Sequence, residues 1–308
     1  MRDGFLLVDK PSGYTSFDVI ARLRGILKQK KIGHGGTLDP NVTGVLPVFV
    51  GRGTKAIDIL SNHDKKYTAT FRLGITTDTQ DIWGEVTKEC ESEKDIKKIE
   101  AAVLSFKGKQ KQLPPMYSAI KVNGVRLYDL ARQGAVVPRE SREIEVYDIE
   151  FLGKTQNENE YSFNVYCSKG TYVRTICADI GEKLGCGAAM TSLVRTMAHG
   201  FEIEDCFSLD EIQKAADENR VDELMRPISD LFCDLPPIYL SEKQTKMYIN
   251  GVTLDPKRVS GVIYDSAYVI AEWQKYAVYS ENRKFLGIGQ VKYPEREFKS
   301  LKLFLGEE

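Results

Sequence analysis

Asp39 is a carboxylate at the end of a glycine-rich stretch, a setting in which it could do chemistry. Residues 33–38 read Gly-His-Gly-Gly-Thr-Leu, and the three glycines around His34 allow backbone torsions closed to other residues, so the segment can approach a ligand closely. Pro40 follows and biases Asp39 towards extended backbone. This arrangement suits a nucleophile or general base, although a plain Asp-Pro turn would have the same sequence. A second Leu-Asp-Pro, residues 254–256, lacks the glycines, and we assign it to a structural turn.

Two segments with helical periodicity are candidates to position this carboxylate. Residues 15–18 resemble a capping box, and the apolar residues after them recur at helical spacing, which predicts a helix over residues 16–28. Apolar residues recur in the same way over residues 173–184. This pattern predicts a helix that begins near Tyr172 and carries Arg174 in its first turn.

Two further segments alternate strictly between apolar and polar residues. Residues 67–73 place Tyr67 on the apolar face, and residues 161–167 follow the same pattern, so both predict half-buried strands. Strands and helices interleave along the chain without a regular βαβ rhythm. We therefore expect an α+β catalytic domain.

Prolines between residues 226 and 237 mark the expected domain boundary, because they end an acidic helical stretch. Beyond it, residues 260–293 are rich in Tyr, Val, Ile and Gly in short alternating runs, such as residues 268–273, which predicts a small β domain. We therefore expect a catalytic domain over residues 1–230 and a small second domain over residues 231–308.

Charge is unevenly distributed along the chain. The 308 residues are 42% hydrophobic and 28% charged, enough for two domains, and the formal net charge of −1 gives no overall attraction to phosphate. Residues 1–60 carry an excess of four basic side chains and residues 107–142 an excess of six, whereas residues 202–224 carry an excess of seven acidic ones. A protein with one RNA-facing side would be polarised in this way, but ordinary solvated faces would give the same pattern.

Cysteine usage and hydropathy indicate the compartment. The six cysteines form no Cys-x-x-Cys pair and three lie in apolar patterns, so we expect reduced structural thiols and neither disulfides nor zinc ligands. No run of about 18 apolar residues is present to span a bilayer, and the charged start is unlike a signal peptide. The sequence therefore predicts a cytoplasmic protein without a membrane segment.

Five ordered motifs resemble those of the TruB family of tRNA pseudouridine synthases and together cover nearly the whole chain. The Asp39 stretch, residues 33–47 continued by residues 51–55, looks like the family signature, and residues 7–18 resemble the motif before it. The other matches follow in the same order at Tyr67 and at residues 115–121, 167–174 and 193–196. The C-terminal segment is more weakly similar to a PUA domain, with residues 287–289 as the best local cue.

The resemblance implies both a fold and a reaction. The fold would be a catalytic domain with a mixed, mainly antiparallel sheet, followed by a PUA-like β-barrel. The family detaches uracil from its ribose, rotates it and rejoins it through C5, with one aspartate and no metal or cofactor. Asp39 would be that nucleophile and would attack either C1′ of the ribose or C6 of the base. Arg174 would keep this carboxylate ionised, and Tyr67 would stack on the extruded base or handle the C5 proton.

The remaining residues that the resemblance assigns to the site contact or support the RNA. His34 would fill the space left by the flipped base, and Tyr172 and Leu193 would form walls of the uracil pocket, although both would also suit plain core. Lys10 would support the catalytic loop without reacting. Residues 107–142 would be a basic arm that clamps the RNA through Lys121, Arg126 and Arg132.

By the same resemblance, the partner is the T-arm stem-loop of tRNA, modified at the uridine numbered 55 in tRNA after base flipping. We expect a monomer with no metal and no membrane partner. Two alternatives stay open. One is a non-catalytic RNA-binding or RNA-chaperone protein, in which Asp39 is only a turn residue. The other is a guide-dependent pseudouridine synthase subunit that needs partner proteins.

Overall fold

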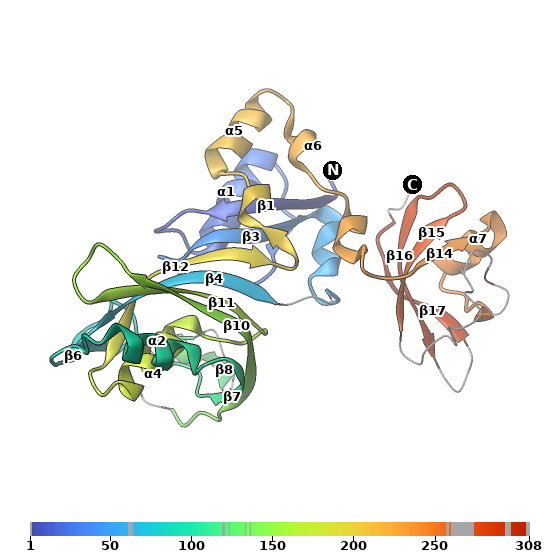
Figure 1. Cartoon of the computed structure of the whole chain (residues 1–308). Helices are drawn as coiled ribbons and strands as arrows, with labels where there is room; N and C mark the ends of the chain where they lie inside the picture. The colour runs from blue at the N-terminus through green and yellow to red at the C-terminus, as the bar shows by residue number, and fades with distance from the viewer. Residues whose placement is uncertain are drawn as a thin grey trace.

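The structure is a computed structural model that describes residues 2–60, 64–118, 121–122, 124–132, 134–135, 137–256, 259, 274–292 and 297–305. Within these residues most strands join one nine-stranded sheet, and a separate four-stranded sheet lies towards the C-terminus (Figure 1). Helices cover the large sheet, which confirms the expected α+β class.

The large sheet joins strands that are far apart in the sequence. Its order is β1-β3-β12-β4-β11-β10-β7, with β2 paired to β3 and β13 paired to β12. The strands are β1 (Gly4–Lys10), β2 (Ile32–His34), β3 (Thr43–Val50), β4 (Lys65–Leu73), β7 (Gly108–Gln112), β10 (Arg142–Lys154), β11 (Glu160–Cys167), β12 (Ala188–Ala198) and β13 (Phe201–Glu202). Neighbours are antiparallel except β3 and β12, which are parallel, so the sheet is mixed and mainly antiparallel.

The strands β4 and β12 form the middle of this sheet and supply its alternating core. In β4 the predicted apolar face is buried, including Tyr67, Phe71 and Leu73. These side chains pack with the inner faces of α2 (Ile96–Leu104) and α4 (Val173–Lys183). Figure 1 shows these two helices together on one side of β10 and β11. The strand predicted over residues 161–167 is β11.

Both predicted helices begin where the sequence indicates. In α1 (Ser16–Leu27) the Thr15 hydroxyl accepts from the Asp18 amide while the Asp18 side chain accepts from the Thr15 amide, which is a complete capping box. The helix ends at Lys28, whose φ of 50° is left-handed. In α4 the extended residue Tyr172 is the N-cap, and Arg174 lies in the first turn.

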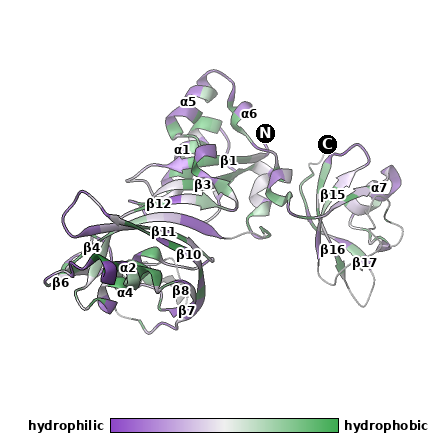
Figure 2. Cartoon of the chain, viewed as in Figure 1, coloured by the Kyte–Doolittle hydropathy of each residue, from purple (hydrophilic) through white to green (hydrophobic). Residues whose placement is uncertain are grey.

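The acidic stretch forms an amphipathic cover over β1 and β3. Its helices are α5 (Leu209–Asp217) and α6 (Val221–Leu224). Both hydropathy colours occur along α5 in Figure 2, and its apolar residues pack against α1 and the inner side of β1. The acidic side chains of residues 202–224 therefore belong to the solvent-exposed side of a segment whose apolar side packs into the core.

Shorter elements connect these parts. The hairpin strands are β5 (Ile75–Thr77), β6 (Val86–Glu89), β8 (Lys121–Val122) and β9 (Val125–Arg126), and the basic arm also contains α3 (Leu127–Arg132). Three 3-10 turns are η1 (Gly51–Ala56), η2 (Ile203–Asp205) and η3 (Ile228–Phe232).

The C-terminal sheet runs in the order β14-β15-β16-β17 and has its own apolar cluster. Its elements are β14 (Pro237–Leu240), α7 (Glu242–Ile249), β15 (Lys275–Ser280), β16 (Phe285–Lys292) and β17 (Glu297–Leu303). The second Leu-Asp-Pro has a structural role, because Leu254 exchanges backbone hydrogen bonds with Phe298. Residues 268–273, predicted to alternate as a strand, lie outside the described residues.

Polar contacts and an apolar cluster join this sheet to the N-terminal part of the chain. The side chains of Arg52 and Lys55 donate to the carbonyls of Phe304 and Leu303, both over 3.2 Å. Ile288 and Phe304 also belong to the cluster that contains Phe5 of β1. The two parts therefore share packing as well as a linker.

The cysteines behave as structural thiols. All six are free in the structure, and Cys167, Cys177 and Cys186 are buried. Burial raises the pKa of the Cys167 thiol to about 11. In the described part of the chain no helix is long and apolar enough to cross a membrane.

Candidate active site

A cavity of about 170 Å³ opens beside Asp39. Its lining comes from distant segments of the chain: Thr37, Leu38, Asp39, Val42, Tyr67, Ser118, Thr171, Tyr172, Val173, Arg174, Met190 and Leu193. The fold thus brings together the three residues expected to act in catalysis and both residues expected to form the uracil walls. No pattern in the sequence by itself places these segments side by side.

Backbone and side-chain hydrogen bonds fix the loop that carries Asp39 between β2 and β3. The Ser16 hydroxyl accepts from the Leu38 amide over 2.9 Å and donates to the Leu38 carbonyl over 3.2 Å. The Pro40 carbonyl accepts from the Gly13 amide over 3.0 Å. The start of α1 therefore holds the loop, while the Asp39 side chain remains half exposed beside the cavity.

Lys10 supports the same loop from inside the protein. Its side chain is completely buried, and its amine donates to the carbonyls of Pro11, Tyr14 and Pro40 over 2.9, 2.5 and 2.9 Å. Burial lowers the pKa of this amine to about 8, and the nearby Asp39 carboxylate opposes that shift. All three N–H donors of the ammonium group are used, so Lys10 supports the Asp39 loop. It has no exposed surface that could contact RNA.

Arg174 carries the positive charge nearest to Asp39. Its Nη2 lies 3.4 Å from Asp39 Oδ2, and its Nη1 lies 3.5 Å from Asp81 Oδ2. Nη2 also donates to the carbonyl of Tyr117. The guanidinium is only 7% exposed, so two carboxylates flank a charge that water hardly reaches.

Asp81 is a site residue that the sequence analysis missed. Its Oδ1 accepts from the Thr79 hydroxyl over 2.7 Å and from the Trp83 amide over 3.1 Å, which leaves Oδ2 directed to Arg174. The residue is buried, although it lies in a polar loop. In the sequence it looks like Asp78 three residues earlier, and only the fold shows which of the two meets the arginine.

Tyr67 lines the cavity from β4, and its ring is almost fully buried. Burial raises the pKa of its hydroxyl to about 12, with a smaller opposing effect from Arg195. The hydroxyl therefore stays protonated in the neutral range. It can donate a hydrogen bond, and its ring can present a flat face to a planar ligand.

Hydrogen bonds also fix a wall of the cavity. The side chain of Gln112, at the end of β7, accepts from the Tyr172 amide over 2.8 Å and donates to the Tyr172 carbonyl over 3.0 Å. Leu193 faces inward from β12 and is buried. Tyr172 and Leu193 are thus placed as the resemblance implies.

His34 is not among the residues that line this cavity. His34 is the last residue of β2, opposite Val48, and burial lowers the pKa of its imidazole. Lys121, Arg126 and Arg132 lie on β8, β9 and α3, and their side chains are outside the described part of the structure.

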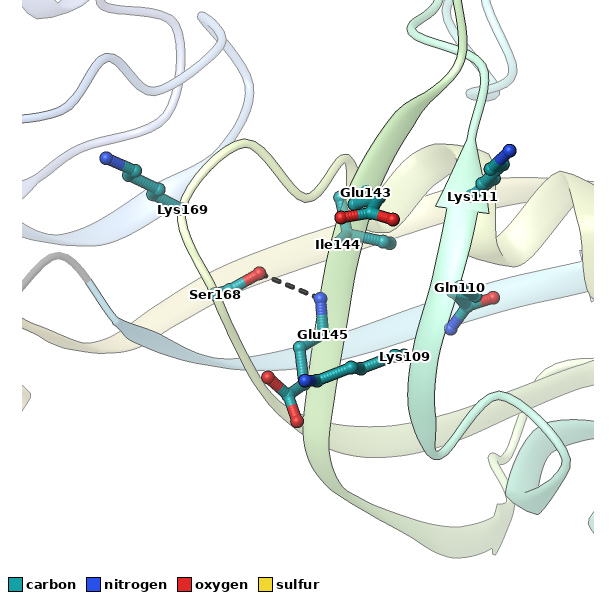
Figure 3. Close-up of a pocket in the computed structure, with 8 residues that line it drawn as sticks. All are labelled: Lys109, Gln110, Lys111, Glu143, Ile144, Glu145, Ser168 and Lys169. Atoms are coloured by element: carbon teal, nitrogen blue, oxygen red, sulfur yellow. Dashed lines mark hydrogen bonds between the residues drawn. The ribbon is translucent and has the colours of Figure 1, made fainter.

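A larger groove, of about 420 Å³, runs along β7 and β10 (Figure 3). It contains Lys109, Lys111 and Lys169 beside Glu143 and Glu145. Its lysines are exposed to solvent, so it lacks the enclosed carboxylate and arginine of the Asp39 cavity. The groove suits contact with a polyanion better than covalent chemistry.

The Asp39 cavity combines a reactive carboxylate with a charge that stabilises it. Asp39 can attack an electrophilic carbon, Arg174 can hold the carboxylate in place, and the apolar walls admit a flat ring. Within the described residues no group of three or more His, Cys, Asp or Glu side chains is placed to hold a metal ion. The Asp39–Arg174 pair and the apolar walls together favour nucleophilic catalysis by a carboxylate.

The chain is similar to known proteins over most of its length. Residues 24–173 match the N-terminal domain model of the TruB family of pseudouridylate synthases, and residues 174–232 match the C-terminal domain model of tRNA pseudouridylate synthase B. The chain is 41% identical to tRNA pseudouridine synthase B of Clostridium kluyveri, covering 98% of this chain and 100% of that protein. It is 44% identical to the Bacillus subtilis protein of the same name, covering 83% of this chain and 84% of that protein.

A solved structure has the same fold. A chain from the crystal structure of a Cbf5-Nop10-Gar1 complex superposes with a TM-score of 0.73 and 25% sequence identity, covering 98% of this chain and 85% of that one.

Replacing Lys10 by Met should lower the free energy of unfolding by at least about 2 kcal/mol, because three backbone carbonyls lose the donor that the buried amine supplies. Lys30→Met removes an exposed lysine and serves as the control. Urea unfolding followed by circular dichroism measures both variants. Equal stability of the Lys10 variant and the control would mean that the amine does not hold the loop.

Proposed function

The chain belongs to the TruB family of pseudouridylate synthases and is a tRNA pseudouridine synthase, and we propose that Asp39 is its catalytic nucleophile. The observation that carries this proposal is the pairing of Asp39 with the buried Arg174 in a cavity that Tyr67 also lines. A fixed cation beside the carboxylate can hold it in the orientation that attack requires.

The proposed reaction is an isomerisation in which Asp39 is regenerated. Asp39 forms a bond to C1′ of the ribose or to C6 of the base, and the bond between N1 and C1′ breaks. The uracil rotates, C5 forms the new bond to C1′, and the bond to Asp39 breaks. The C5 proton leaves and N1 gains one, so atoms and charge balance without an oxidant or a cofactor. Arg174 orients the Asp39 carboxylate during the attack and the release.

The cavity walls support a role in holding the flipped base. Tyr67 offers its ring for stacking, which is worth about 1–3 kcal/mol for a nucleobase, and Leu193 and Tyr172 close the apolar sides. The Tyr67 hydroxyl, with its pKa of about 12, keeps its proton at neutral pH and is a candidate to hydrogen-bond the base as the C5 proton leaves.

We propose that the substrate uridine is position 55 in the T-loop of tRNA, reached by base flipping at a cost of a few kcal/mol. His34 stands next to the glycines that open the Asp39 loop, and we assign it to the space that the base vacates. Recognition through loop shape and flipped bases suits RNA, whose helical grooves hide the sequence from side chains.

The basic arm is proposed to clamp the stem of this RNA. The arm begins at β7, whose Gln112 holds the cavity wall while Lys109 and Lys111 face the groove of Figure 3. Lys121, Arg126 and Arg132 follow in β8, β9 and α3. The arm therefore starts at the cavity and continues with cations, as a phosphate-gripping segment would.

We further propose that residues 231–308 form a second, RNA-binding domain and that the chain works as a cytoplasmic monomer. A separate apolar cluster in the C-terminal sheet supports the domain assignment. All proposed site residues come from one chain, so a second subunit is not needed to complete the cavity. Activity of the isolated chain on a bare tRNA transcript separates this proposal from a guide-dependent subunit.

Replacing Asp39 by Asn should abolish pseudouridine formation while tRNA affinity changes only a few fold, because an amide cannot act as the nucleophile and affinity comes from other contacts. Tritium release from tRNA labelled at uridine C5 measures the reaction, and filter binding measures affinity. Asp78→Asn is a matched control outside the cavity lining. Turnover by a clean Asp39 variant would remove the proposed mechanism and favour an RNA-binding role for the residue.

Neutralising Lys121, Arg126 and Arg132 to Gln should flatten the salt dependence of tRNA binding. If the arm makes Z phosphate contacts, log affinity falls with log salt at a slope of roughly −0.7Z to −0.9Z. The control replaces Lys94, Lys97 and Lys98 by Gln, which removes the same charge near α2. Identical slopes for the arm variant and the wild type would show that the arm is only a solvated face.

A further inference from the structure

Arg195 is a fully buried cation in the middle of the large sheet. It lies on β12 between Leu193 and Met197, on the face that points into the protein, and its exposed fraction is 0%. No carboxylate of the described residues forms an ion pair with it. An isolated buried charge is costly, so hydrogen bonds must offset the loss of water.

Two of its nitrogens donate to backbone on either side of Asp39. Nε donates to the Val45 carbonyl over 2.7 Å, and Nη2 donates to the Gly36 carbonyl over 3.0 Å. Gly36 precedes Asp39 by three residues and Val45 follows it by six. One planar group therefore ties both ends of the Asp39 loop to β12.

The strand pairing beside the Asp39 loop is short. Pairing of β12 with β3 covers only Val194 with Thr43 and Arg195 with Gly44. The Val45 carbonyl lies one residue beyond this short ladder, and the guanidinium supplies its donor on that side. Gly36 has a φ of +85°, and a Cβ there would lie 3.3 Å from Nη1, so glycine lets the guanidinium come close.

Arg195 also lies beside Tyr67 in the sheet. Arg195 and Tyr67 are direct partners in the antiparallel pairing of β12 with β4, so their side chains share a face. The charge of Arg195 and its hydrogen bonding both lower the pKa of that hydroxyl, against the larger effect of burial. Arg195 thus contacts two parts of the cavity that come from different strands.

We propose that Arg195 is a positioning residue for pseudouridine formation, which holds the Asp39 loop and the Tyr67 hydroxyl in one fixed relation. The proposal rests on the assignment of Asp39 and Tyr67 above. A methionine or leucine would fill a purely structural position at lower cost, whereas three fixed contacts from one rigid group give the nucleophile and the stacking ring a common anchor. The side chain itself does not line the cavity, so it acts through its neighbours.

The test compares Arg195→Lys and Arg195→Gln in single-turnover assays at saturating enzyme. A lysine keeps the charge and a glutamine keeps a donor, but neither can contact Gly36, Val45 and Tyr67 together. We expect the rate of isomerisation to fall at least tenfold in both variants, with tRNA affinity within a few fold of wild type. Arg72→Lys, on the exposed face of β4, is the control and should keep the full rate.

A double-mutant cycle with Tyr67→Phe separates positioning from general packing. If Arg195 acts partly through the Tyr67 hydroxyl, the two substitutions together slow the reaction less than the product of their separate effects. Independent effects, or a fully active Arg195→Lys, would overturn the proposal while an inactive Asp39→Asn leaves the nucleophile in place. Loss of folding in both Arg195 variants, seen by circular dichroism, would assign the residue to the core and overturn it as well.

Discussion

The buried guanidinium of Arg174 constrains the rest of the site, because a charge removed from water needs polar partners in fixed positions. Asp39 and Asp81 supply two negative partners from two loops, and each loop must then be held in place. Asp39 is held through Ser16 at the start of α1, and Asp81 through its own turn. The position of one arginine therefore determines how the catalytic loop, the β5-β6 hairpin and α4 meet.

Two other buried cations, Lys10 and Arg195, donate hydrogen bonds to backbone carbonyl groups and not to carboxylates. Lys10 donates to the Pro40 carbonyl directly after Asp39, while Arg195 donates to the Gly36 carbonyl before it. These contacts leave the Asp39 carboxylate free for Arg174 and for a substrate.

Local patterns in the sequence predicted the elements well, and the family resemblance named five of the residues that line the Asp39 cavity. The capping box predicted the start of α1, and the alternation predicted the buried face of β4. The apolar spacing predicted that Arg174 lies in the first turn of α4. Asp81 was missed because its partner Arg174 is far away along the chain. The sequence near it does not favour Asp81 over Asp78. The tie of Arg195 to Gly36 depends on the parallel approach of β12 to β3, which no local periodicity encodes.

The replacement of Arg174 by Lys tests the central ion pair most directly. Lysine keeps the positive charge but loses the fork that meets Asp39 and Asp81 at once. The account predicts that the single-turnover rate on a bare tRNA transcript falls at least tenfold, about 1.4 kcal/mol in the barrier, while tRNA affinity stays within a few fold. A lysine variant with the wild-type rate would contradict it, because the paired geometry would then have no part in positioning the nucleophile.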